Sequence, residues 1–118
     1  MNAELARHWI EIIRAQLPDD VNVESLMNVG QAGIIFIDRP APLEGRQNRR
    51  SRNIRLRFPE ATITQYLNET QPAQAVADTH LVDFILRRIG GIDWEHDEPR
   101  HEMIPGEVFV MDNDVIFP

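Results

Sequence analysis

Residues 52–58 alternate between polar and apolar side chains, and this alternation limits the possible folds more than any other feature of the chain. The apolar positions are Ile54, Leu56 and Phe58, and the polar ones between them are Asn53, Arg55 and Arg57. Successive side chains of a strand point to opposite faces, so the pattern predicts a strand with one buried face. A sheet with one apolar face needs a second layer, and amphipathic helices can supply it.

The first segment of the chain, about 3–17, predicts a helix of that covering layer. Its apolar stripe at helical spacing consists of Leu5, Trp9, Ile12, Ile13 and Leu17. Asn2 suits the N-cap position, and Pro18 disfavours helical geometry for the residue before it.

Two more helices are predicted after the alternating strand, beginning near Pro59 and Pro72. The first runs through Asn68, with an apolar stripe of Ile63, Tyr66 and Leu67. The second runs to about Ile89 and ends at Gly90-Gly91. Its inward side chains are expected to be Val76, Ala77, Leu81, Phe84, Ile85 and Ile89.

Two strands are expected between the first helix and the alternating strand. Residues 21–29 alternate, residues 34–38 form the returning strand, and a short turn with two glycines joins them. So short a connection makes the pair antiparallel, and we expect the same of the whole sheet. The proline- and arginine-rich residues 40–51 predict a mobile loop.

The C-terminal segment predicts one or two strands. Val108–Met111 and Val115–Phe117, joined through residues 112–114, suggest a terminal hairpin or one bent strand, and Ile92 and Trp94 suggest a short strand. The chain is thus predicted to be a single α+β domain over residues 1–118, a two-layer sandwich with the order α-β-β-β-α-α-β-β. Ten residues are expected to share its core: Leu5, Trp9, Ile12, Ile13, Ile54, Leu56, Phe58, Leu81, Phe84 and Ile85.

Composition excludes several classes of function. The chain has no cysteine, which rules out disulfides, thiolate metal sites and cysteine nucleophiles, and favours a cytoplasmic location. Its longest apolar run, Ile34–Ile37, is too short to span a bilayer, and the N-terminus lacks a signal-peptide pattern, so no membrane partner is expected. The formal net charge of −7 repels anionic surfaces.

A basic segment interrupts this acidic chain, which has no lysine. It contains half of the arginines and no acidic residue: Arg46, Arg49, Arg50, Arg52, Arg55 and Arg57. Such a segment is typical of phosphate-contacting surfaces, and the order helix, three strands, helix resembles that of double-stranded RNA-binding domains. However, the second helix begins Pro59-Glu60-Ala61 without a basic residue, and the net charge opposes phosphate binding. Nucleic acid is therefore not the expected partner, and RNA association through this segment is an alternative.

A second alternative is metal binding or catalysis in the acidic segment 94–102. The candidate ligands are His96, Asp97 and His101. The two histidines are five residues apart with Pro99 between them, which does not match the helical zinc motif, and a solvated acidic loop explains them as well. Neither Ser25 nor Ser51 lies in a glycine-flanked nucleophile elbow. We therefore predict no catalytic residue, no metal site and no cofactor.

The function expected from these observations is non-catalytic protein–protein interaction. In size, charge and architecture the chain resembles bacterial immunity proteins, secretion chaperones and phage-encoded antagonists. The partner would be another protein or a second copy of the chain. In a homodimer, Arg55 and Arg57 of one copy would meet the acidic segment 93–114 of the other, with apolar contacts around Phe109 and Phe117.

Overall fold

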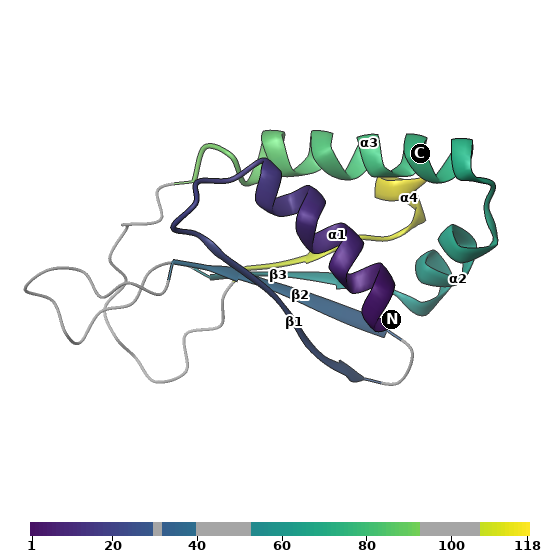
Figure 1. The fold of residues 1–118 in the computed structure, drawn as a ribbon, viewed down its shortest axis with the longest axis horizontal. Helices are drawn as coiled ribbons and strands as arrows, with labels where there is room; N and C mark the ends of the chain where they lie inside the picture. The colour runs from purple at the N-terminus through teal and green to yellow at the C-terminus, as the bar shows by residue number, and fades with distance from the viewer. Residues whose placement is uncertain (30–31, 40–52, 93–106) are drawn as a thin grey trace, which may run out of the picture.

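The computed structural model describes residues 1–29, 32–39, 53–92 and 107–118. In chain order the elements are α1 (Ala3–Ala15), β1 (Asn22–Val29), β2 (Ala32–Asp38), β3 (Asn53–Phe58), α2 (Glu60–Asn68), α3 (Gln71–Arg88), β4 (Glu107–Val110) and α4 (Asn113–Ile116). The fold class is α+β, as predicted, with a helical layer on one side of a four-stranded sheet (Figure 1).

Side-chain caps and prolines set where the helices begin and end. The Asn2 side chain accepts a hydrogen bond from the Leu5 backbone N–H at 2.7 Å, which confirms the predicted N-cap of α1. Helix α1 ends two residues earlier than predicted, ahead of Pro18. Thr70 caps α3 in the same way through the Ala73 N–H, with Pro72 in the first turn of that helix.

The sheet has the strand order β1-β2-β3-β4. The first three strands form the predicted antiparallel meander. Strand β4 joins β3 in parallel, with Leu56 opposite Phe109, so the expectation of an entirely antiparallel sheet was wrong. The physical reason is the connection: α2 and α3 lie between β3 and β4, and a helical crossover allows the chain to return in the same direction.

The second predicted C-terminal strand is a helix. Asp112 accepts hydrogen bonds from the N–H groups of Asp114 and Val115, and this cap turns the chain into α4 instead of a hairpin. The His80 ring contacts the Ile116 carbonyl at 2.9 Å, with Nδ1 as the donor, and so fastens α4 to α3. Ile92 lies in no strand. Trp94 is outside the described residues, as is the predicted 40–51 loop.

The core lies between the helices and one face of the sheet. Eight of the ten predicted core residues belong to it, and the other two, Ile12 and Phe84, are partly buried and pack against it. At its centre the rings of Trp9 and Phe58 stack with centroids 4.4 Å apart. Leu67 and Val76 were predicted to face inward but are 48% and 55% exposed. Each lies one residue, about 100° of helix rotation, from a buried neighbour.

No helix in the described parts of the chain is long and apolar enough to cross a membrane.

Candidate functional site

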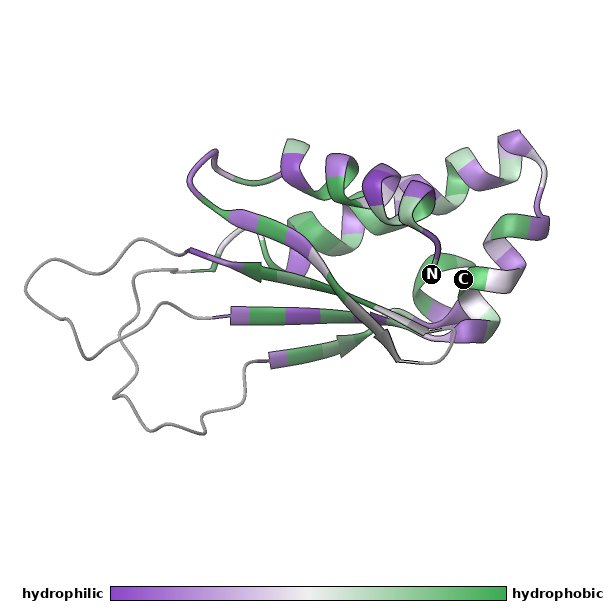
Figure 2. Ribbon diagram, turned by 60° about the horizontal axis from the view of Figure 1, so that its bottom comes forward, coloured by the Kyte–Doolittle hydropathy of each residue, from purple (hydrophilic) through white to green (hydrophobic). Residues whose placement is uncertain are grey.

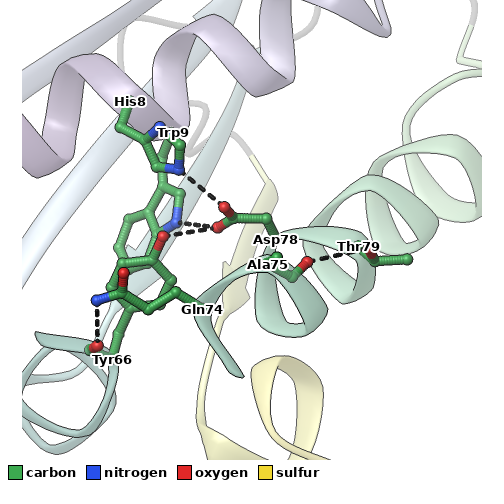
Figure 3. A network of polar contacts seen from close by, with 7 residues as sticks. All are labelled: His8, Trp9, Tyr66, Gln74, Ala75, Asp78 and Thr79. Atoms are coloured by element: carbon green, nitrogen blue, oxygen red, sulfur yellow. Dashed lines mark hydrogen bonds and ion pairs between the residues drawn. The ribbon is translucent and has the colours of Figure 1, made fainter. Parts of the chain in front are cut away.

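Three helices meet at the carboxylate of Asp78 on α3 (Figure 3). Its Oδ1 accepts hydrogen bonds from Tyr66 Oη on α2 at 2.9 Å and from Trp9 Nε1 on α1 at 3.3 Å. Its Oδ2 accepts one from His8 Nε2, also on α1, at 2.8 Å. Both carboxylate oxygens are therefore occupied by donors from neighbouring helices.

The ionisation of Tyr66 follows from this environment. Burial raises the pKa of its hydroxyl above the ordinary value of 10.0, and the hydrogen bond to Asp78 and the charge of that carboxylate raise it further. The hydroxyl therefore stays protonated throughout the physiological range. It acts as a hydrogen-bond donor to Asp78 and not as a base.

A carboxylate bonded to a histidine also occurs in catalytic triads, where the histidine activates a nucleophile. Within the described residues, no serine or threonine hydroxyl hydrogen-bonds to His8. Trp9 and Tyr66 are almost fully buried, and their rings pack edge to face at 5.0 Å. The cluster therefore has the features of a structural junction that holds α1, α2 and α3 together.

The second candidate is the face of the sheet that the described helices leave uncovered (Figure 2). Strand register places side chains on this face in adjacent columns. We call the central six residues the open-face patch, and they are Ile34 and Phe36 on β2, Arg55 and Arg57 on β3, and Val108 and Val110 on β4. Two cross-strand rows run through it: Phe36, Arg55 and Val108 form one, and Ile34, Arg57 and Val110 form the other.

The exposure of the open-face patch is uneven. Val108 and Val110 are 53% and 44% exposed, and both arginines are exposed. Phe36 and Ile34 are half-buried beside them. Other exposed large apolar residues stand apart: Val76 and Leu86 are separated by ten residues of α3, about 15 Å. Two adjacent exposed valines beside two arginines thus form a more continuous apolar surface than any helix presents in the described chain.

Within the described residues, no ion pair neutralises the charges of the patch. Neither Arg55 nor Arg57 forms an ion pair within the described structure, where the ion pairs are His8–Asp78 and Arg39–Asp20. In the row of Arg55 the nearest acidic residue is Glu24 on β1, two strands and therefore about 9.6 Å away. Asp38 on β2 lies one row along, diagonally across from Arg55, and accepts a hydrogen bond from the Asn22 side chain. The patch is thus a small positive surface on a chain of net charge −7.

The residues predicted from sequence divide between the described and the undescribed parts of the chain. Arg55 and Arg57 are exposed on the sheet, as the alternation predicted. Arg46, Arg49, Arg50 and Arg52 lie outside the described residues, and so do the metal candidates His96, Asp97 and His101. Within the described residues no three histidine or acidic side chains are grouped closely enough to hold a metal ion.

The two phenylalanines named in the homodimer prediction are not the apolar residues that flank the arginines. Phe109 was expected to supply exposed apolar surface, but it faces the helices and packs edge to face on Phe84 at 5.4 Å. Phe117 packs against the core as well. The exposed apolar residues are instead Val108 and Val110, and the signal that could have found them is their alternation with Phe109.

Asp78 was also missed. Its only sequence signal is an acidic residue beside Ala77 on the inward stripe of a helix, and that signal does not reveal the three donors. Comparisons of the chain with protein-family models, with curated proteins and with solved structures found no match.

Proposed function

We propose that this chain is a non-catalytic protein-binding domain whose contact surface is the open-face patch. The observation that carries the proposal is the pairing, in one continuous surface, of exposed valines with exposed arginines that form no ion pair with any described residue. Arginine combines an apolar stem with a planar group that forms paired hydrogen bonds, and it is enriched in protein interfaces. Exposed apolar side chains at the centre of a patch gain from being covered by a partner.

The histidine–carboxylate pair supports a non-catalytic role. Asp78 already accepts hydrogen bonds on both oxygens, and two of its donors belong to the packed helix layer. Moving Asp78 to assist a reaction would leave Trp9 and Tyr66 without their acceptor, which is unfavourable for buried donors. The surface on the opposite side of the molecule, in contrast, can change its contacts without disturbing the core.

The test compares two double variants that place glutamates at matched exposure. Val108→Glu/Val110→Glu alters the open-face patch, and Val76→Glu/Leu86→Glu alters α3 at residues exposed to a similar extent. Partners recovered with the wild-type chain from cells that encode it are purified, and their affinity for each variant is measured by calorimetry. We expect the first variant to lose at least about tenfold in affinity and the second to bind as the wild type does.

Thermal unfolding of both variants establishes that they are folded before binding is compared. A purified partner that binds both double variants with unchanged affinity would overturn the proposal, because its contact surface would then lie elsewhere. Binding that only the α3 variant loses would also contradict it and would assign the contact surface to the helices.

A further inference from the structure

The geometry of the open-face patch points to one kind of occupant, and we infer that it binds an amphipathic helix of a partner protein that carries acidic residues along the middle of its apolar face. This inference rests on the function proposed above and adds the chemistry and shape of the ligand. It follows from the spacing of the columns, the spacing of the arginines and the sign of the charge.

The width of the patch fits one helix. Neighbouring strands lie about 4.8 Å apart, so the apolar columns of β2 and β4 are separated by about 9.6 Å with the arginine column midway. A helix with its side chains is about 10–12 Å in diameter. One helix aligned with the strands would therefore cover Ile34 and Phe36 with one edge of its apolar face and Val108 and Val110 with the other.

The distance between the two arginines matches the distance between acidic residues four positions apart on a helix. Arg55 and Arg57 are two residues apart on β3, which separates their Cα atoms by about 6.6 Å along the strand. Residues four apart on a helix are about 6 Å apart along its axis. Two glutamates at positions i and i+4 of a docked helix would thus reach one guanidinium each. Arginine bonds carboxylates in a bidentate geometry that lysine does not reproduce.

The flanking residues strengthen this contact. Phe36 and Val108 lie on either side of Arg55, and Ile34 and Val110 lie on either side of Arg57. When a partner covers these apolar side chains, water is excluded from the arginine–carboxylate pairs, and the pairs are screened less than they would be in an open surface. The same arrangement disfavours a second copy of this face as the occupant, because a two-fold contact would bring arginines close to arginines.

The experiment uses three synthetic helical peptides that differ at two positions. In each peptide, two rows of leucine form the edges of the apolar face. Residues i and i+4 lie between these rows and are both glutamate in the first peptide, both glutamine in the second and both lysine in the third. Fluorescence anisotropy measures the binding of each peptide to the full chain, to Arg55→Glu/Arg57→Glu and to the matched control Arg87→Glu/Arg88→Glu at the exposed end of α3.

We expect the wild type and the α3 control to bind the glutamate peptide at least about tenfold more tightly than the glutamine peptide, because bonds between charged partners are stronger than those to neutral ones. The Arg55→Glu/Arg57→Glu variant should invert the preference and bind the lysine peptide best. The preference for glutamate should also decrease at high salt.

Equal affinity for all three peptides, or a preference that survives Arg55→Glu/Arg57→Glu, would overturn the acidic-helix inference. Tighter binding of a single-stranded RNA oligonucleotide than of the glutamate peptide, with loss in the same variant, would overturn it in favour of nucleic acid. The acidic-helix inference can fail while the proposed function holds. A natural partner that loses affinity for the Val108→Glu/Val110→Glu variant, but that binds through a segment other than an acidic helix, would refute only the inference.

Discussion

The two faces of the sheet are built from the same strands, but one is buried beneath the helices and the other is partly exposed. On the covered face, Ile35, Ile54 and Leu56 are fully buried beneath the helices. On the open face, residues of equal hydrophobicity such as Val108 remain about half exposed. The difference shows that alternation along a strand divides residues between two faces, whereas the position of the helices decides which face becomes the core.

The charge of the two faces differs in the same way. On the covered side, the carboxylate of Asp78 in the helix layer accepts hydrogen bonds from three donors. The open face leaves Arg55 and Arg57 without an ion pair among the described residues. Substitutions on the covered side should therefore act mainly on stability, and substitutions on the open face mainly on binding.

The largest effect is expected where the covered face contacts α1. Phe58→Ala removes a fully buried ring that stacks on Trp9 and should lower the free energy of unfolding by about 3–5 kcal/mol. Phe36→Ala, on the open face of the neighbouring strand, should lower it by only about 1–2 kcal/mol because its ring is half-buried. Urea denaturation measures both, and equal losses would refute the contrast between the two faces.

Removing the central acceptor of the helix layer should have the next largest effect. Asp78→Ala leaves the Trp9 and Tyr66 donors unpaired and should lower the free energy of unfolding by about 2–4 kcal/mol. Thr79→Ala is the matched control: the adjacent residue is exposed, and its hydroxyl bonds only to the Ala75 carbonyl of its own helix. The control should change stability by less than about 0.5 kcal/mol, and similar losses in the two variants would contradict the assigned role of Asp78.

A substitution at Gly33 would measure how tightly the covered face is packed at its edge. A Cβ at this position would lie 2.6 Å from Met1 Cε and 2.7 Å from Met1 Cβ, so Met1 would have to move. Gly33→Ala should therefore cost about 1–3 kcal/mol in denaturant titration. At Gly91 an added Cβ meets nothing within 4 Å, and Gly91→Ala should be close to neutral. A neutral Gly33→Ala would show that Met1 does not fill the space above β2.

Alkaline pH should weaken the helix layer through Tyr66. Its pKa is raised in the folded state, so the unfolded chain loses the phenolic proton first as pH rises past about 10, and stability falls by up to about 1.4 kcal/mol per pH unit. The chain has one tyrosine, no cysteine and no lysine, so no other side chain of ordinary pKa titrates near that pH. Denaturation between pH 8 and 11.5 should show this decline in the wild type but not in Tyr66→Phe. A tyrosinate absorbance titration with a midpoint near 10 in the folded protein would contradict it.

The smallest stability effect is expected on the open face. Arg55→Glu and Arg57→Glu should each change the free energy of unfolding by less than about 0.5 kcal/mol, because both side chains are exposed and neither forms an ion pair within the described residues. Chemical denaturation of the single variants measures this. A loss above about 1 kcal/mol in either variant would mean that the arginines stabilise the fold, and it would weaken their assignment to a binding surface.

Much of the fold could be predicted from sequence because its signals are local. The strict alternation around Leu56 predicts β3 and its exposed arginines, and the helical stripe ending at Pro18 predicts α1. The candidate surface could be predicted only in part. Arg55 and Arg57 were identified as exposed, but their apolar neighbours come from β2 and β4, and no local pattern states which strands flank β3.

The sequence by itself determined the α+β class, the N-terminal helix that ends ahead of Pro18 and the inward side of β3, because periodicity and proline act over a few residues. Only the tertiary structure decided that β4 lies parallel beside β3, that residues 113–116 form a helix, and that Asp78 accepts bonds from Trp9 and Tyr66. These features depend on contacts between residues distant in the chain. Their free energy comes from packing the helices on one face of the sheet, and it is not encoded in any single segment.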